Sequence, residues 1–462
     1  MKTIRSTLLG IAALLALAGP LAVAQRPNVV LILSDDQRPD TIAALGNPAI
    51  QTPALDALVR RGTVLAGMTC AFPVCVPSRT ELLTGRTYAH AIARGESQPP
   101  TLAEALRAAG YHTWHVGKWH VAGRPTTRGY EESNGLYTET AKRPIPPIER
   151  NAHGEPITGY RGWVFQNDAG KEFPEHGVGL TPNISERFAD AAIELIRRDT
   201  TRPFFLHLNF TAPHDPRFVP KGYEGRYPPA KMPLPANFAR EPAIKLDTRD
   251  ERLLPRPLPM DRLREELATY YALISHLDAQ VGRVLVALRE TGKADNTIII
   301  YTSDHGLALG SHGLLGKQNL YDHTLRVPCI VTGPGIPAGA TRNGLAYLRD
   351  LGPTILELCR TQSPAGTDSL SLAGMIAGRV AQVRPFVVGT YLDEAWAVRT
   401  ERWKLITLVK ERREQLFDLK NDPHELRDLS GNPAQAKQAA ELRQLWAGWV
   451  KDNGPITVTR EP

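Results

Sequence analysis

The sequence predicts an α/β fold: a large, mixed and mostly parallel β-sheet sandwiched by helices, followed by a small antiparallel sheet with one helix. In residues 25–369, apolar runs typical of buried strands alternate with runs of helical periodicity, the pattern of parallel sheets. Several of these strand-like runs end in charged residues, as strands do where they open onto a site in α/β proteins. From residue 370 the pattern changes to four short strands and a closing helix, at 386–392, 395–400, 403–409, 414–419 and 433–451.

The first 24 residues have the features of a secretory signal peptide. Lys2 and Arg5 precede an apolar run at 8–18, and an Ala-Val-Ala cleavage signal ends at Ala24. The alternative, a membrane anchor, is disfavoured because the run is too short to span a bilayer and no longer run follows. We therefore predict a periplasmic or secreted protein without stable membrane insertion.

Composition excludes few functions. The net charge of +7 comes from basic residues that are dispersed along the chain, which favours surface solubility over nucleic-acid binding and suits an anionic substrate. Four cysteines are present, and in an oxidising compartment they allow disulfides that the sequence does not pair. They are Cys70, Cys75, Cys329 and Cys359.

Two elements near the start of the chain are the most informative. Residues 29–33 form a continuous apolar run, as in a strand buried on both faces, and Asp35 and Asp36 follow it. A helix is predicted to begin at Pro77, where the missing amide hydrogen is no loss, and to end at Gly85. The other elements predicted before residue 370 are helices at 52–62, 101–110, 184–198 and 261–290, and strands at 111–120, 203–210 and 298–302.

Two long stretches, 121–180 and 216–259, are rich in Gly, Pro and Arg and show little periodicity. Irregular segments of this length in a compact protein are usually functional. We expect both to roof a pocket, with conceivable substrate contacts at Arg94, Glu96, Arg128, Trp163 and Arg217.

Polar residues follow several of the predicted strands. Each cluster alone has an ordinary structural interpretation, since an Asp pair commonly caps a helix. If the strands are neighbours, however, all the clusters share one edge of the sheet, and like charges at short range need compensation, most simply by a divalent cation. The clusters are Asp35 with Asp36, Lys118 with His120, His214 with Asp215, Asp304 with His305, and Lys317 in a following loop.

These residue types indicate the ligand. Asp35, Asp36 and Asp304 offer the hard oxygen ligands that suit Ca²⁺ or Mg²⁺, and His305 is a less typical partner. The helix near Pro77 adds backbone amide donors at its N-terminus. We therefore predict a small tetrahedral oxyanion, a sulfate or phosphate ester, held by the metal and by three cations, Arg79, Lys118 and Lys317.

One stretch also carries a resemblance. "CVPSRTELLTG", residues 75–85, matches the C-x-P-S-R-x-x-x-L-T-G signature of the formylglycine-dependent (type I) sulfatases in full. The resemblance covers nearly the whole mature chain and implies an alkaline phosphatase-like fold, a catalytic domain at 25–369, a C-terminal subdomain at 370–462 and sulfuric ester hydrolysis. The other segments that occur in the family's order are "LILSDDQRPD", "GYHTWHVGKWH", "TAPHDP", "YTSDHGLALGSHGLLGK", "RWKLI" and "QLFDLKNDPHELRDL".

The resemblance implies a modified nucleophile. In this family the motif cysteine, here Cys75, is oxidised to formylglycine (3-oxoalanine) by a maturation enzyme that recognises the positions of Pro77 and Arg79. One hydroxyl of the hydrated aldehyde attacks sulfur, and the other, once deprotonated, eliminates sulfate. A serine has no such internal route to release.

The resemblance also implies roles for the clustered residues. Arg79 would hold the modified side chain, Lys118 and Lys317 would grip sulfate oxygens, His214 would protonate the leaving alcohol, and His120 would assist deprotonation of the second hydroxyl. Many relatives carry Asn where His305 stands, which leaves the identity of the metal slightly open. Ca²⁺ is expected, with Mg²⁺ or Mn²⁺ as alternatives, on Asp35, Asp36, Cys75, Asp304 and His305.

The substrate expected is a sulfated small molecule or glycan, with carbohydrate sulfates preferred over choline or aryl sulfates. Two other functions remain as alternatives. The first is a formylglycine-dependent hydrolase of phosphonate or phosphate esters, and the second is a catalytically silent polyanion-binding protein. The second is disfavoured because Cys75, Lys118, His214 and Lys317 are all present.

Overall fold

A nine-stranded sheet forms the centre of the computed structural model, which describes residues 25–93, 100–151, 153–454 and 458. The predicted signal peptide lies outside these residues. Across the sheet the strands are ordered β12 (Ala340–Arg342), β2 (Thr63–Leu65), β11 (Cys329–Thr332), β10 (Thr297–Ser303), β1 (Asn28–Ser34), β9 (Phe204–Asn209), β4 (His112–Lys118), β5 (Glu132–Thr138) and β8 (Val164–Gln166). The neighbours from β10 to β5 run parallel, and β11 and β8 flank them antiparallel. The predicted mixed, mostly parallel sheet is confirmed.

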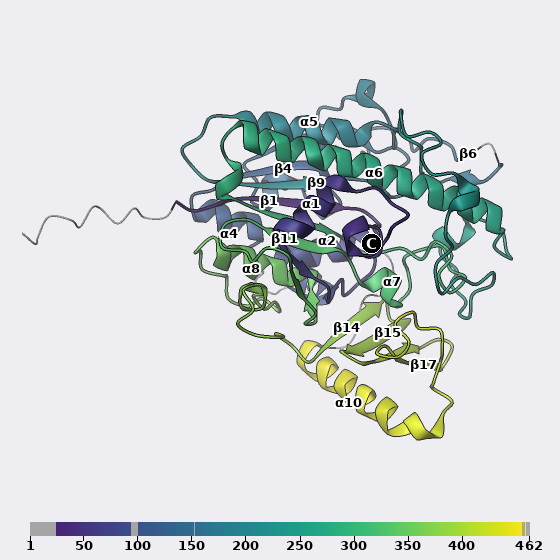
Figure 1. Ribbon diagram of the computed structural model, residues 1–462. Coiled ribbons are helices and arrows are strands. Elements are labelled where there is room, and N and C mark those ends of the chain that lie inside the picture. The colour runs from purple at the N-terminus through teal and green to yellow at the C-terminus, as the bar shows by residue number, and fades with distance from the viewer. Residues whose placement is uncertain (1–24, 94–99, 152, 455–457, 459–462) are drawn as a thin grey trace, which may run out of the picture.

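Helices cover both faces of this sheet (Figure 1). Alternate side chains of β1 enter different cores: Val30 and Ile32 pack with the helices of one face, and Val29 and Leu31 with those of the other. A strand buried on both faces explains why this run is apolar without interruption. The first face carries α1 (Pro53–Arg61), α5 (Ile184–Arg197) and α6 (Met260–Glu290), and the second α2 (Cys75–Thr84), α4 (Leu102–Ala108) and α8 (Leu351–Leu358).

The C-terminal region is the predicted small sheet with one helix, α10 (Ala436–Asn453), as Figure 1 shows. Trp396 of the sheet stacks on Trp446 of α10, with ring centroids 4.5 Å apart. The opposite face packs into the same core as α2 and α8, through residues that include Ala397 and Ile406. The boundary at residue 370 therefore stays a prediction. The antiparallel strands are β14 (Phe386–Tyr391), β15 (Ala395–Thr400), β16 (Trp403–Leu408) and β17 (Arg413–Asp418).

The stretch 121–180 is more regular than predicted, because it contributes β5 and β8 to the main sheet. The sequence of β5, ESNGLYT, has no apolar run, and Gly135 has a positive φ of 63° that interrupts its alternation. The stretch 216–259 is irregular apart from two short 3-10 helices, as predicted. Shorter elements are β3 (Met68–Thr69), β6 (Glu149–Arg150), β7 (Pro156–Ile157), β13 (Ala346–Tyr347), α3 (Tyr88–Ile92), α7 (Asp322–Leu325) and α9 (Ala373–Ile376).

None of the helices in the described part of the chain is both long and apolar enough to cross a membrane. The longest, α6, spans 31 residues.

Candidate active site

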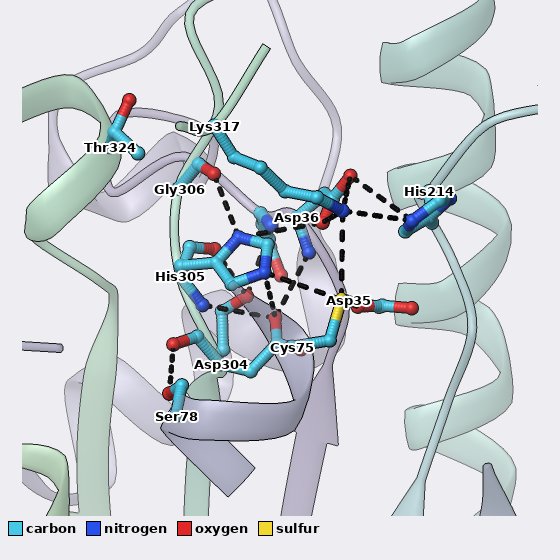
Figure 2. A network of polar contacts seen from close by, with 12 residues as sticks. Asp35, Asp36, Cys75, Ser78, His214, Asp304, His305, Gly306, Lys317 and Thr324 are labelled. Carbon is cyan, nitrogen blue, oxygen red and sulfur yellow. Dashed lines mark hydrogen bonds and ion pairs between the residues drawn. The ribbon is translucent and has the colours of Figure 1, made fainter. Parts of the chain in front are cut away.

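The polar residues that follow the strands meet at one edge of the sheet, as predicted. Strands β10, β1, β9 and β4 are parallel neighbours, so their carboxyl ends open on the same side. Figure 2 shows Cys75 in the middle of these side chains, with Lys317 reaching in from its loop. The edge gathers Asp35, Asp36, Lys118, His214, Asp304 and His305, which follow or end these strands.

Helix α2 brings Cys75 into this group. The helix begins at Cys75 itself, so the prediction that it begins at Pro77 was wrong. Pro77 still lies in the first turn, where amide hydrogens have no partner within the helix. The helix ends at Gly85 in the left-handed conformation, as predicted. Ser78 donates a hydrogen bond of 2.6 Å to the backbone carbonyl of Asp304, which ties the first turn to the end of β10.

Arg79 links α2 to three strands. Its Nε donates to Asp304 Oδ2 at 2.9 Å, its Nη1 donates to Asn209 Oδ1 at 3.0 Å, and its Nη2 lies 3.5 Å from Asp35 Oδ1. The other oxygen of Asp304 accepts backbone hydrogen bonds from Asp36 and His305, at 3.2 and 2.9 Å. Even so, burial and the charge of Asp35 raise the pKa of Asp304 to about 6. Carboxylates are therefore crowded at this edge.

Two buried lysines each pair with one of the adjacent aspartates. Lys118 Nζ lies 2.7 Å from Asp35 Oδ2. Lys317 Nζ lies 2.9 Å from Asp36 Oδ1, 2.9 Å from His214 Nε2 and 3.5 Å from Cys75 Sγ. Asp36 has a φ of 65°, a left-handed conformation that is unusual for an aspartate. Backbone conformations of this kind cluster at functional sites.

Two histidines contact Cys75 Sγ, and a third, His214, contacts Lys317, which also reaches this sulfur. His305 Nε2 lies 3.4 Å from Cys75 Sγ, and although burial opposes it, Asp304 and Asp36 raise the pKa of His305 to about 9. His120 also contacts the thiol, and burial lowers the pKa of its imidazole. His214 points its Nδ1 at Asp215, with 3.3 Å to Oδ1. The charges of Asp36 and Asp215 outweigh burial and raise the pKa of His214.

The thiol of Cys75 lies in a strongly positive environment. Burial alone would raise its pKa, but Lys118, Lys317 and His305 together hold the pKa well below its usual value. The buried Cys70, close in sequence, shows the opposite effect, because burial and two nearby carboxylates raise its pKa. This difference between two cysteines of one chain marks position 75 as an anion-stabilising site.

The cluster also fits a metal ion. Ligand atoms of Asp35, Asp36, Cys75 and His305 all lie within 4.8 Å of one another and all four residues are buried. Two aspartates supply the oxygen donors that hard divalent cations prefer. Asp304 is not part of this group, its oxygens are bound by Arg79 and backbone amides, and its role as a ligand stays a prediction.

Two residues of the site were not predicted from the sequence. Tyr160 donates a hydrogen bond to Asp35 Oδ2, and Asn209 accepts one from Arg79. Asn209, a polar residue at the end of an otherwise apolar buried strand, carried a signal that could have been used. Tyr160 carried none, because the segment around it has no periodicity.

The residues proposed as substrate contacts lie in different environments, and two of them are outside the described part of the chain. Trp163 is buried beside His120. Arg217 Nη1 donates a hydrogen bond of 2.9 Å to Glu266 Oε2, so the guanidinium of Arg217 is engaged in a structural ion pair. Arg128 is half-buried, and Arg94 and Glu96 lie outside the described residues. All four cysteines are free and buried.

Comparison with known proteins identifies the class. The model of the sulfatase family matches residues 27–361, and a second family model, described as N-sulphoglucosamine sulphohydrolase, C-terminal, matches residues 310–449. The chain therefore belongs to the sulfatase family. It is a sulfuric ester hydrolase with the alkaline phosphatase-like fold that the signature implied.

Individual relatives agree with this assignment. An arylsulfatase of Clostridium perfringens is 30% identical, over 91% of this chain and 93% of the relative. A multifunctional alkaline phosphatase superfamily protein, PehA of Trinickia caryophylli, is 28% identical, over 94% and 97%. A structure solved in complex with its substrate, D-glucosamine-2-N,6-O-disulfate, superposes with a TM-score of 0.77 at 24% identity, covering 94% of this chain and all of that one. At this identity the superposition establishes the fold.

Proposed function

We propose that this chain is an exported sulfatase that hydrolyses sulfate esters of carbohydrates, with Cys75 oxidised to formylglycine by a maturation enzyme. The observation that carries the proposal is the surroundings of Cys75 Sγ: Asp35 Oδ1 and Lys317 Nζ at 3.5 Å and His305 Nε2 at 3.4 Å, at the N-terminus of a helix. A side chain there meets cations and metal-binding groups at once. This suits a nucleophile that must attack an anionic ester.

The neighbouring residues have matching roles. Lys118 and Lys317 bind the sulfate oxygens and stabilise the negative charge that develops during transfer. Arg79 holds residue 75 and balances the carboxylates. His214, whose raised pKa favours its protonated form, gives its proton to the leaving alcohol, and His120, whose lowered pKa favours its neutral form, accepts a proton at residue 75.

A divalent cation completes the site. Asp35, Asp36, Asp304, His305 and residue 75 would hold it, and Ca²⁺ is expected, with Mg²⁺ or Mn²⁺ as alternatives. When bound, such an ion supplies positive charge against the oxygens of residue 75 and of the sulfate.

Two comparisons support a carbohydrate substrate: the second family model is described as that of an N-sulphoglucosamine sulphohydrolase, and the superposed structure holds a glucosamine disulfate. Choline or aryl sulfates remain alternative substrates. A second candidate function is hydrolysis of phosphonate or phosphate esters. It is supported by the similarity to PehA, described as a multifunctional alkaline phosphatase superfamily protein, and by a superposed phosphonate monoester hydrolase of Silicibacter pomeroyi.

Rates on matched substrates test the proposal. Matured enzyme is assayed on an aryl sulfate, the corresponding aryl phosphonate and glucosamine 6-sulfate. We expect kcat/KM to be highest on a sulfate, with the sugar sulfate turned over although its leaving group is poor. A phosphonate that reacts faster than both sulfates would favour the second candidate function.

A further inference from the structure

Tyr160 reaches the site from the irregular segment between β7 and β8. Its side chain is buried, and its hydroxyl donates a hydrogen bond to Asp35 Oδ2. Lys118 Nζ binds the same oxygen at 2.7 Å. Burial and the charge of Asp35 raise the pKa of Tyr160 well above its usual value, so the phenol stays a hydrogen-bond donor. Asp35 is thus held from two directions.

The ring of Tyr160 also contacts His214. The two rings meet edge to face, with centroids 4.6 Å apart. Trp163 packs against Tyr160 and His120: its ring centroid lies 4.7 Å from that of Tyr160 and 4.8 Å from that of His120, both edge to face. Two aromatic side chains of one segment therefore touch both imidazoles to which we assign proton transfers.

The segment is fixed against the turn that carries His214. A Cβ atom added at Gly159 would lie 2.3 Å from the backbone carbonyl oxygen of Asp215, so the two backbones are in direct contact and only glycine fits. Tyr160 itself has a positive φ of 55°. Such a conformation persists where the surroundings enforce it, and here it turns the phenol toward Asp35.

We propose that Tyr160 is a positioning residue of the sulfatase site, whose hydroxyl orients Asp35 and whose ring orients His214. The inference rests on the proposed function, because it takes Asp35 as a metal ligand and His214 as the acid. It adds a residue whose two parts act on different steps. The hydroxyl affects every substrate, while the ring affects substrates that need a proton on the leaving group.

Two variants separate these parts. Tyr160→Phe keeps the ring and removes the hydroxyl, and Tyr160→Leu removes both. We expect Tyr160→Phe to lower kcat/KM about 10-fold on aryl and alkyl sulfates alike and to weaken binding of Ca²⁺ about 10-fold, as changes to groups that orient metal ligands do. Tyr160→Leu should cost about a further 10-fold on alkyl sulfates only. Binding of Ca²⁺ alone is measured by its effect on the Tm of metal-depleted protein.

The control is Tyr347→Phe, a buried tyrosine whose hydroxyl bonds to the backbone of Val388 instead. This variant should change Tm without changing substrate preference or the Ca²⁺ midpoint. Tyr160 variants that behave like this control would overturn the inference, as would an equal loss on both substrates in Tyr160→Leu. If the matured protein without any substitution hydrolyses no sulfate ester, the proposed function fails, but the Ca²⁺ midpoint of Tyr160→Phe still decides whether the hydroxyl supports Asp35.

Discussion

The strand-end site and the junction with the C-terminal sheet both bury several charges, but they use them differently. At the junction, Lys404 Nζ lies 2.8 Å from Asp322 Oδ1 and 2.7 Å from Glu425 Oε1, and Arg399 Nε lies 3.2 Å from Asp322 Oδ2. Each charge there has an opposite charge as its partner. At the strand-end site the lysines also pair with aspartates, but there the charged groups in addition converge on one atom, Cys75 Sγ.

This difference shows what distinguishes a reactive site from a structural ion network when both are buried. Pairing within a network cancels the charges and ties elements together, here α7 to β15 and β16. Convergence leaves a net effect on the central group, visible in the lowered pKa of Cys75. Substitutions at the strand-end site should therefore reduce activity, and substitutions at the junction should reduce stability.

The largest effect is expected at Cys75. Cys75→Ala removes the proposed nucleophile and should lower kcat by about 10⁴-fold or more, the scale seen when a nucleophile is deleted. The Tm should change little, because the thiol contacts charged groups rather than filling the apolar core. Turnover and thermal unfolding of the same preparation measure both, and a variant with normal turnover would remove Cys75 from the mechanism.

Matched lysine substitutions compare the two regions directly. Lys317→Met should lower kcat/KM about 10²- to 10³-fold, since one donor to the developing charge is lost. Lys404→Met leaves Glu425 buried without its cation and should destabilise the fold by about 3–5 kcal/mol, while folded molecules stay active. Denaturant unfolding and steady-state kinetics on both variants give the comparison. The opposite pattern would mean that the regions have been assigned the wrong way round.

His214 tests the proton transfer. His214→Ala should lower kcat/KM about 10²- to 10⁴-fold on alkyl sulfates and far less on aryl sulfates, because only poor leaving groups need the proton. The measurement is a series of sulfate esters of graded leaving-group pKa. Equal losses across the series would point to a structural role for His214.

The smallest effect concerns pH and the junction. Burial, with Asp322 nearby, raises the pKa of Glu425 from 4.5 to about 7. A folded-state pKa above the unfolded one means that the fold binds the proton more tightly, so this contribution to stability is present at low pH and is lost as pH rises from about 4.5 to about 7. Glu425→Gln should remove that pH dependence, worth on the order of 1–3 kcal/mol. Denaturant unfolding at pH 5 and pH 7.5 checks it, and an unchanged pH profile would contradict the assignment.

Much of the fold was predictable from the sequence because its signals are local. The uninterrupted apolar run predicts β1 directly. The helix predicted at 101–110 also forms, and a capping box of Thr101 and Glu104 holds its start in the structure. Strand β5 was missed because it lies near the sheet edge, next to β8, where burial on both faces is not required. The start of α2 was misplaced because proline is tolerated throughout the first turn, not only at its first residue.

Most of the candidate site was also predictable from the sequence, because most of its residues follow predicted strands. Residues such as Asp35 and Asp304 stand at strand ends, so the topology alone brings them together. Tyr160 depends on a segment whose path is set by contacts across the fold, including the close approach of Gly159 to Asp215. No pattern within the segment itself could reveal that path.

The most direct test of a formylglycine nucleophile is the mass of the tryptic peptide 62–79, from protein that is produced with a maturation enzyme and hydrolyses a sulfate ester. We predict that residue 75 carries an aldehyde in place of the thiol. The fraction of converted peptide should rise in proportion to kcat across preparations. An intact Cys75 thiol in protein that turns over sulfate esters at full rate would contradict the proposed mechanism.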